Sequence, residues 1–291
     1  MPRHPKRPRR SVDSVLEALV DRIDARSSEG PAPDTVPTGF ASLDRMLGGG
    51  MRRQDLIVLA GDVGSGKSAL ALGIAVRAAG AGIPSMYFSG EMNPERVLER
   101  ALALEGRAAI DELRAGKLDD ATRATVGAAA VRLRHQPLVV RPLAGTGFGE
   151  ISEAADIVPR RQLLIVDSLQ LTAPPRMVSR LQERVASSIR ALKSLAMERD
   201  LVVLVTAQLG HHRSDRADPR PALDDLGGLG AIKQSADVVL MLYREEMYRP
   251  GQGVEGAAEL IVAKNRNGVT GFVDLYFYPR WLRFVDMLDA D

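Results

Sequence analysis

A glycine-rich segment between a predicted strand and a predicted helix constrains the fold more than any other feature. Residues 61–68 read Gly-Asp-Val-Gly-Ser-Gly-Lys-Ser, after the apolar run 56–60 and before the helix-forming run 69–75. The spacing G-x-x-x-x-G-K-[ST] is typical of a loop whose backbone N–H groups surround phosphates at the positive end of a helix. A chance glycine-rich turn is the alternative, and the flanking strand and helix disfavour it. The sequence therefore predicts a nucleoside triphosphate site.

Within this loop the sequence assigns a role to each polar group. Lys67 is expected to reach the β- and γ-phosphates, and the Ser68 hydroxyl is expected to hold Mg²⁺. ATP and Mg²⁺ are the expected ligands. The residues predicted to contact the nucleotide are Gly61, Val63, Gly64, Ser65, Gly66, Lys67, Ser68 and Ala69.

Composition limits the class of protein. The chain has 291 residues, of which 45% are hydrophobic, enough for one α/β domain with appendages. It has no cysteine, so disulfides, thiolate zinc sites and cysteine catalysis are excluded. No apolar run approaches the roughly 20 residues that cross a bilayer, and no signal peptide is recognisable. We therefore expect a soluble, cytoplasmic protein with no membrane partner.

Charge is concentrated at the N-terminus. The net charge is +2, and residues 1–10 contain five basic residues and no acid, so the rest of the chain is slightly acidic. A nucleic-acid partner would therefore need local basic loops rather than a generally basic surface. We interpret residues 1–10 as a disordered basic tail, for which a solvated terminus is favoured over a binding arm.

A separate helix is predicted before the main domain. Ser11 can cap a helix over residues 11–26 whose apolar positions recur at helical spacing, and residues 27–34 are typical of a flexible linker. The apolar stripe must be covered either by the chain's own core or by a neighbouring subunit, and we favour the neighbour. We assign residues 11–35 to the linker helix and linker, and 36–291 to the main domain.

Continuous apolar segments alternate with helical ones in the main domain. Apolar strands separated by helices favour an α/β fold with a mainly parallel sheet covered on both faces. Asn93 is expected to cap one helix, and a helical hairpin is expected over 107–135 with breaks at Gly116 and Asp119 or Asp120. Strands are predicted at 56–60, 85–89, 138–140, 163–166, 201–206, 238–242, 258–263, 272–277 and 282–285, and further helices at 149–158 and 181–195.

Three polar residues come at or just after predicted strand ends. In an open α/β sheet the ligand lies beyond the carboxyl ends of the strands, where we expect Glu91, Asp167 and Gln208 to gather around the phosphate loop. Asp167 would orient Mg²⁺ and Glu91 would accept a proton from the attacking water. Gln208 could sense the γ-phosphate. Each has an ordinary alternative as a helix-capping or surface group, but together they indicate a catalytic site.

Residues 264–268, Lys-Asn-Arg-Asn-Gly, are a candidate source of positive charge for phosphoryl transfer. Such transfer commonly uses an arginine supplied by a neighbouring subunit. The alternative is a charged hairpin turn, because Asn-Gly is a common turn pair.

Together these motifs resemble the C-terminal ATPase domain of the bacterial replicative helicase DnaB, within the RecA-like superfamily. The likeness extends from about residue 36 to residue 285. It is carried by the phosphate loop and by Val-Pro-Thr-Gly-Phe at 36–40, Leu-Asp-Arg-Met at 43–46, Phe-Ser-Gly-Glu-Met at 88–92, Leu-Arg-Ala-Gly-Lys-Leu at 113–118, Val-Asp-Ser-Leu-Gln-Leu at 166–171, Ala-Gln-Leu at 207–209, Ile-Lys-Gln-Ser-Ala-Asp at 232–237, Leu-Tyr-Arg at 242–244 and Lys-Asn-Arg-Asn-Gly at 264–268.

The resemblance implies a hexameric ring with ATP at each interface, moving on single-stranded DNA. It implies that Glu91 is the catalytic carboxylate, that Lys264 and Arg266 act on the neighbour's nucleotide, and that helix 11–26 docks on the next subunit. Primase and a loader are the expected further partners. The loop expected to contact DNA includes Arg213, Arg216, Arg220, Gly230 and Lys233.

Two departures from the family pattern leave an alternative open. Only about 35 residues precede the ATPase domain, so we expect the family's N-terminal domain, which carries primase contacts, to be absent. Gly227-Gly228-Leu229 replaces the usual Arg-Glu-Ser of the DNA-facing loop, removing an expected phosphate contact that Lys233 could partly replace. Residues 47–50 and 89–91 also resemble the RadA branch. The alternative function is a nucleotide-gated DNA-binding or assembly module without unwinding activity.

Overall fold

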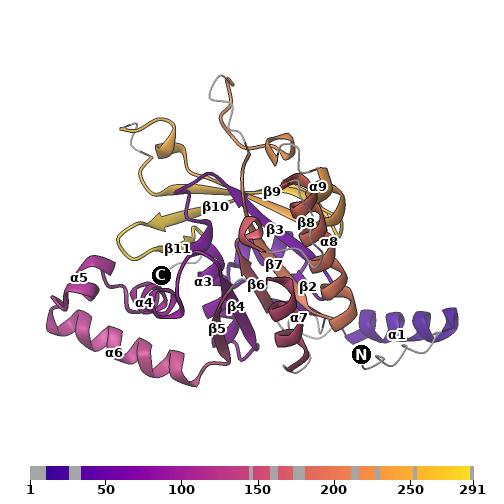
Figure 1. Ribbon diagram of the computed structural model, residues 1–291, viewed down its shortest axis with the longest axis horizontal. Coiled ribbons are helices and arrows are strands. Elements are labelled where there is room, and N and C mark those ends of the chain that lie inside the picture. The colour runs from indigo at the N-terminus through magenta and orange to yellow at the C-terminus, as the bar shows by residue number, and fades with distance from the viewer. Residues whose placement is uncertain are drawn as a thin grey trace. The chain divides into compact units, whose positions relative to one another are not determined.

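In the computed structural model, the apolar segments form a nine-stranded mixed sheet covered by helices on both faces (Figure 1). The structure describes residues 11–25, 34–143, 147–157, 163–172, 181–210, 216–226, 230–251 and 254–288. By its internal contacts the chain divides into two units, residues 1–33 and 34–291. Among the described residues no helix is both long and apolar enough to cross a membrane.

The elements follow the predicted alternation of strand and helix. The strands are β1 (Thr35–Val36), β2 (Met51–Arg52), β3 (Leu56–Gly61), β4 (Ser85–Ser89), β5 (Leu138–Pro142), β6 (Leu163–Asp167), β7 (Val202–Gln208), β8 (Val238–Tyr243), β9 (Ala257–Asn265), β10 (Gly271–Tyr278) and β11 (Arg283–Asp286). The helices are α1 (Val12–Ala25), α2 (Ala41–Met46), α3 (Lys67–Gly80), α4 (Pro94–Gly106), α5 (Ile110–Ala115), α6 (Asp120–His135), α7 (Phe148–Ile157), α8 (Leu181–Arg199) and α9 (Gly230–Ser235), with short 3-10 turns η1 (Leu169–Leu171), η2 (Leu223–Leu226) and η3 (Glu245–Met247).

The sheet has a parallel part and an antiparallel part. Its strand order is β11-β10-β9-β8-β3-β7-β6-β4-β5. The strands from β8 to β5 in that order run parallel, whereas β9, β10 and β11 add antiparallel neighbours beyond β8. The expectation of a mainly parallel sheet flanked by helices is confirmed. The short antiparallel pair β1 and β2 is an addition that the sequence did not predict.

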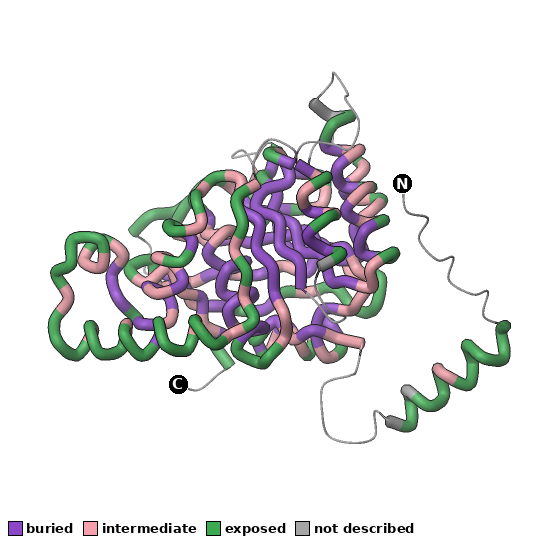
Figure 2. Tube along the Cα trace, turned by 60° about the horizontal axis from the view of Figure 1, so that its bottom comes forward, coloured by how far each residue is buried: buried purple, intermediate pink, exposed green. Residues whose placement is uncertain are grey.

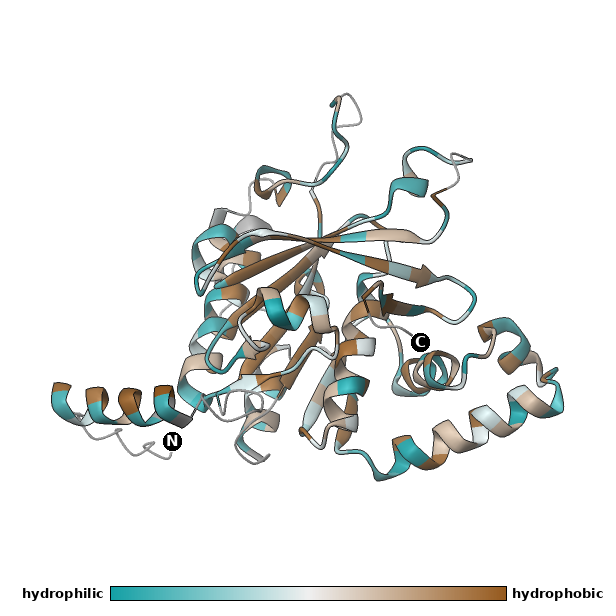
Figure 3. Ribbon diagram, turned by 180° about the vertical axis from the view of Figure 1, so that it is seen from behind, coloured by the Kyte–Doolittle hydropathy of each residue, from teal (hydrophilic) through white to brown (hydrophobic). Residues whose placement is uncertain are grey.

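Two hydrophobic cores lie on opposite faces of the sheet. Along β3, Ile57 and Leu59 pack into the core shared with α3 and α4, while Leu56 and Val58 pack into the core shared with α7, α8 and α9. This is the alternation of side chains that a strand buried on both faces requires. Figure 2 shows the buried strands at the centre of the main unit, and Figure 3 shows that they are its most hydrophobic segments.

Local capping signals place several helix ends as expected. The Asn93 side chain accepts a hydrogen bond from the Arg96 N–H (2.9 Å) at the start of α4. At the start of α6, Asp119 accepts from the Thr122 N–H (2.7 Å). Gly116 ends α5 with a positive φ of 67°. The predicted breaks in the 107–135 hairpin are therefore confirmed.

One strand begins later than the sequence indicated. Leu201 was included in the predicted strand, but β7 starts at Val202. The Leu201 N–H donates to the Ala196 carbonyl (3.0 Å), closing the C-terminal end of α8, and Asp200 turns the chain with a φ of 61°. Leu201 therefore belongs to the helix-to-strand turn.

The unit that contains α1 is described by itself. Ser11 Oγ accepts a hydrogen bond from the Ser14 N–H (3.2 Å), as expected for an N-cap. The apolar side chains of this helix are exposed to solvent; they are Val12, Val15, Leu16, Leu19, Val20 and Ile23. The predicted apolar stripe is thus present on α1.

Candidate functional site

The glycine-rich loop joins β3 to α3 and leaves the first turn of α3 open. Gly66 stands at the N-cap position of α3 with a φ of 100°, and no side chain caps this turn in the described part of the chain. A Cβ at Gly66 would lie 2.9 Å from the Phe284 ring, and one at Gly61 would lie 2.7 Å from Ser65 Oγ. Glycine at these positions lets the backbone curl tightly, so that N–H groups are available to an anion.

Two further observations fit an anionic ligand at this loop. The Ser65 hydroxyl is buried and has no hydrogen-bond partner among the described residues. Lys67 folds back over the loop, where its Nζ donates to the Asp62 carbonyl (2.6 Å). Burial lowers the pKa of Lys67, and the carboxylates of Asp167, Asp62 and Glu91 oppose that shift. The residues present therefore fit a triphosphate.

Asp167 is held at the end of β6 by three hydroxyl groups. It is 2% exposed, and its Oδ1 accepts hydrogen bonds from Ser68 Oγ (3.1 Å) and Thr206 Oγ1 (2.5 Å). Its Oδ2 accepts from the Tyr87 hydroxyl (2.7 Å). Burial, followed by the Asp167 charge, raises the Tyr87 pKa well above its ordinary value, so Tyr87 stays a donor. The arrangement fixes a carboxylate beside the hydroxyl of the phosphate loop.

The donor set suits a magnesium ion that is shared with phosphate oxygens. Ser68 and Asp167 supply one hydroxyl and one carboxylate, both hard oxygen ligands. Among the described residues no group of three or more His, Asp or Glu could form an all-protein metal site. Mg²⁺ in nucleotide sites is held by few protein ligands, together with phosphate and water, so these two residues fit it.

Glu91 and Gln208 lie at the same edge of the sheet as the phosphate loop. Gln208 ends β7 and pairs in register with Gly61, and Ser89 at the end of β4 pairs with Asp167. The turn after β4 is fixed by the Gly90 N–H, which donates to the Asp167 carbonyl (2.6 Å). Glu91 and Gln208 are both exposed. The structure therefore brings the predicted residues to one edge and leaves two of them accessible.

From the sequence, Arg244 was included in a family motif, but no role at the loop was assigned to it or to Tyr248. Arg244, at the end of β8, donates to the Gly64 carbonyl (3.2 Å) and stacks 4.4 Å from the centre of the Phe277 ring. The Tyr248 hydroxyl donates to the Asp62 carboxylate. Since β8 is the neighbour of β3, the residue after β8 has to lie beside the phosphate loop. That pairing is the signal that could have identified Arg244.

A groove of about 450 Å³ borders the phosphate loop on this side. A Cβ at Gly64 would lie 3.9 Å from the Met247 side chain, so the groove and the loop adjoin. Its lining residues are Arg244, Glu246, Met247, Pro250, Gly251, Glu255, Gly256, Tyr276 and Pro279.

Lys264 and Arg266 lie at the opposite edge of the sheet. Strand β9 runs antiparallel to β8, and Lys264 pairs with Val239 at the beginning of β8. The phosphate loop follows the end of β3, where Gly61 pairs with Leu242 at the other end of β8. The two predicted cations are therefore not brought to the phosphate loop of their own chain.

The charged residues among the predicted DNA-binding residues that the structure describes are engaged in ion pairs. Arg216 forms a bidentate salt bridge with Asp225 (2.8 and 2.5 Å), and Arg220 forms a bidentate salt bridge with Glu259 (2.6 and 2.5 Å). Lys233 Nζ lies 2.5 Å from the Asp224 carboxylate, and Gly230 begins α9. Arg213 and residues 227–229 lie outside the described residues. A phosphate would have to compete with these carboxylates, so DNA contact stays a prediction.

The sheet order, the open phosphate loop and the polar residues at the strand ends define a RecA-like domain of the phosphate-loop class. A family model described as "DnaB-like helicase C terminal domain" matches residues 35–286. The chain therefore belongs to the DnaB-like helicase C-terminal domain family.

Curated relatives are similar over almost the whole chain. It is 35% identical over 280 residues to the "Replicative DNA helicase DnaB" of Leifsonia xyli subsp. xyli, covering 95% of this chain and 61% of that protein. It is 32% identical over 282 residues to the "Replicative DNA helicase DnaC" of Bacillus subtilis, covering 95% and 62%. The chain thus spans about three fifths of the length of these relatives.

Solved structures agree with the assigned fold. A solved structure described as an ATPase domain superposes with a TM-score of 0.88 at 28% identity, covering 95% of this chain and 99% of that one. A DnaB-like replicative helicase, described with its interactions with primase, superposes with a TM-score of 0.86 at 27% identity, covering 96% of this chain and 67% of that one.

Proposed function

We propose that this chain hydrolyses ATP at the interfaces of a homo-hexameric ring and uses the hydrolysis to move on single-stranded DNA and unwind duplex DNA. One observation carries the proposal. Lys264 and Arg266 lie at the sheet edge opposite the phosphate loop of their own chain, which supports a role for these two cations at the nucleotide of a second copy. A DNA partner in turn implies a cytoplasmic site of action.

In this proposal the chain's own residues bind and activate the triphosphate. Lys67 Nζ moves from the Asp62 carbonyl to the β- and γ-phosphates, and the first turn of α3 supplies N–H groups. Ser68 and Asp167 hold Mg²⁺, which when bound supplies positive charge against the phosphate oxygens. Glu91 accepts a proton from the attacking water, and Gln208 contacts the γ-phosphate.

The proposal also assigns surfaces of the chain to contacts with DNA, with the next subunit and with other replication proteins. Arg213, Arg216, Arg220, Gly230 and Lys233 would line the central pore of the ring and contact DNA phosphates. For Arg216, Arg220 and Lys233 this requires that their ion pairs open. Helix α1 would lay its exposed apolar side chains against the next subunit. The similar solved helicase structure is described with its interactions with primase, so we include primase, together with a loader, among the partners to test.

A second candidate function is favoured by one observation. The described arginines and lysine of the predicted DNA loop are all bound to carboxylates. A module that assembles on nucleotide and hydrolyses it slowly would not need those cations to be available. The alternative is therefore a nucleotide-gated assembly module without unwinding activity.

Mixed subunits test hydrolysis in trans. Lys67→Ala should abolish ATP turnover, whereas Lys117→Ala, an exposed matched control, should leave it unchanged. Arg266→Ala and Glu91→Ala should each be inactive alone, and a mixture of the two should regain activity at interfaces that pair intact groups. Arg280→Ala serves as the arginine control. Absence of any recovery in the mixture would refute cations supplied in trans.

Stimulation by single-stranded DNA separates the two functions. A motor should turn over ATP several-fold faster with single-stranded DNA, and the effect should weaken as salt rises because phosphate contacts release counterions. Strand separation on a forked duplex should follow the same salt dependence. An ATPase rate that DNA does not change at low salt would favour the assembly module.

A further inference from the structure

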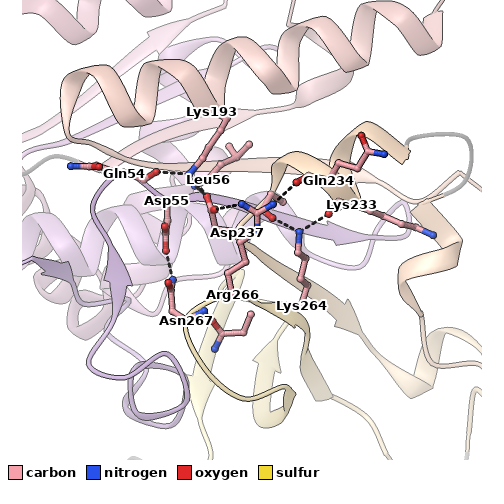
Figure 4. Close-up of polar contacts among 12 residues, drawn as sticks. Gln54, Asp55, Leu56, Lys193, Lys233, Gln234, Asp237, Lys264, Arg266 and Asn267 are labelled. Carbon is pink, nitrogen blue, oxygen red and sulfur yellow. Dashed lines mark hydrogen bonds and ion pairs between the residues drawn. The ribbon is translucent and has the colours of Figure 1, made fainter.

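The two cations proposed to act on the neighbouring nucleotide are held in their own chain by one set of acceptors (Figure 4). Lys264 Nζ donates to the carbonyls of Lys233 (2.5 Å) and Ala236 (2.6 Å). The Arg266 guanidinium donates through Nη2 to the Gln234 carbonyl (2.6 Å) and through Nη1 to Asp237 Oδ1 (3.2 Å). The end of α9 and the residues after it therefore orient both cations.

Asp237 is the charged member of this set and is rigidly held. It is 4% exposed, and its Oδ2 accepts hydrogen bonds from Lys193 Nζ (2.5 Å) and the Leu56 N–H (2.8 Å). Lys193 itself also donates to the Gln54 carbonyl (2.8 Å). The second oxygen of Asp237 is left for Arg266. Since α8 and the start of β3 fix the carboxylate, its position fixes the guanidinium.

Two acceptors from the described residues hold the Arg266 guanidinium, which nevertheless stays partly exposed. Its side chain is 49% exposed, although Asp237 and Gln234 bind two of its nitrogens. Its backbone is also fixed, because the Arg266 N–H donates to the Asp237 carbonyl (2.9 Å). A guanidinium presents its N–H groups in a rigid planar fork, so binding one side of the fork sets the direction of the other.

We propose that Asp237 is a positioning residue for Arg266, and that it orients the guanidinium toward the nucleotide bound by the neighbouring subunit. The inference rests on the proposed function, in which Arg266 acts in trans. A charged partner is needed because a charge-assisted hydrogen bond holds the guanidinium about twice as strongly as a neutral one. Lys193 supports Asp237 in turn, which extends the positioning group to α8.

The test is Asp237→Asn, an isosteric change that removes the charge. If the asparagine oxygen accepts from the Leu56 N–H, the group facing Arg266 becomes an NH₂ donor, and in the other amide orientation Arg266 meets only a neutral acceptor. Steady-state kinetics should show kcat reduced about tenfold or more, with KM for ATP unchanged, because the variant keeps its own phosphate loop.

Mixing assigns the defect to one side of the interface. Asp237→Asn subunits should regain activity when mixed with Glu91→Ala subunits, which supply an intact Arg266. They should regain none with Arg266→Ala subunits, because neither variant presents a correctly oriented arginine. Recovery with Arg266→Ala subunits would overturn the proposal.

Asp286→Asn is the matched control. Asp286 ends β11 and is 1% exposed. It accepts hydrogen bonds from the Ser42 N–H and hydroxyl and makes none with Arg266 among the described residues. Its mixtures with Glu91→Ala and with Arg266→Ala should both be active. If Asp286→Asn reproduced the Asp237→Asn pattern, loss of any buried carboxylate would explain the result and the proposal would fail.

Lys193→Gln covers the case in which Asp237→Asn does not fold. It removes the other charged partner of Asp237 from a more accessible position, and it should lower kcat with the same mixing pattern. Activity of Lys193→Gln equal to wild type would overturn the proposal that Lys193 and Asp237 together position Arg266. Failure of the Arg266→Ala and Glu91→Ala mixture, by contrast, refutes the proposed action in trans itself and is read independently of Asp237.

Discussion

Replacing Asp55 with asparagine should make the protein more stable at neutral pH and change the pH dependence of its stability. Asp55 lies partly buried at the start of β3, and Asn267 Nδ2 donates to its Oδ2 (2.5 Å). Burial, with a contribution from the nearby Asp237 charge, raises the Asp55 pKa from 3.8 to about 6. Asn267, Lys193 and Arg52 oppose this shift but do not cancel it.

The sign follows from proton linkage. The folded protein binds the Asp55 proton more tightly than the unfolded chain does, so this contribution to stability is complete below the unfolded pKa and is lost as pH rises through about 6. The full shift from 3.8 to about 6, at about 1.4 kcal/mol per pKa unit, corresponds to about 3 kcal/mol. Between about pH 4.5 and about pH 7.5, and allowing for solvent screening, the expected loss is about 1 to 2 kcal/mol.

Urea unfolding at these two pH values measures the effect. Asparagine keeps an oxygen for Asn267 but carries no charge, so the difference in unfolding free energy between Asp55→Asn and wild type should grow in favour of the variant by about 1 to 2 kcal/mol toward the higher pH. Asp119→Asn is the contrasting control, because hydrogen bonds from the Thr122 N–H and side chain lower the Asp119 pKa below its ordinary value of 3.8. That contribution to stability is lost only as the pH falls below this window, so Asp119→Asn should show almost no change relative to wild type between the two pH values. Parallel pH profiles for wild type and Asp55→Asn would refute the reasoning.

Three further substitutions test other parts of the structure. Tyr87→Phe removes a buried donor to Asp167, and should cost about 1 to 3 kcal/mol in urea unfolding and raise the Mg²⁺ concentration needed for turnover; unchanged values would contradict the bond. Gly66→Ala forces a Cβ to within 2.9 Å of Phe284 at a φ of 100°, and should abolish binding of a fluorescent ATP analogue; normal binding would show that the loop tolerates a side chain. Leu16→Asp on α1 should reduce assembly in sedimentation without shifting the thermal midpoint, and unchanged assembly would count against docking by this helix.

Much of the fold could be predicted because its signals are local. The apolar run before Gly61 forms β3, the Asn93 and Asp119 side chains cap the helices they precede, and Gly116 ends α5. Each signal acts within a few residues, where propensity and capping chemistry decide the backbone. The phosphate loop and the strand-end residues followed from the same logic, because parallel strands end at one edge.

The missing parts depend on contacts between distant segments. Nothing near Tyr87 indicates that its hydroxyl binds Asp167, 80 positions away in sequence. Likewise, Arg216 and Asp225 pair only once the loop is folded. From the sequence alone, the basic residues of this loop were therefore predicted to be available to DNA. Side-chain partners of this kind are set by tertiary packing, which a pattern of residue types does not specify.

The reversal of chain direction at β9 has a consequence for assembly. In the proposed ring each subunit presents its phosphate loop to one neighbour and its Lys264 and Arg266 to the other, because these groups occupy opposite sheet edges, so the subunits would join head to tail. An open chain built this way always has one terminal subunit whose triphosphate receives no neighbour's cations. When the ring closes, the terminal subunit also receives cations from a neighbour, through the same kind of interface as the others. ATP turnover per subunit would therefore report directly on whether the ring has closed.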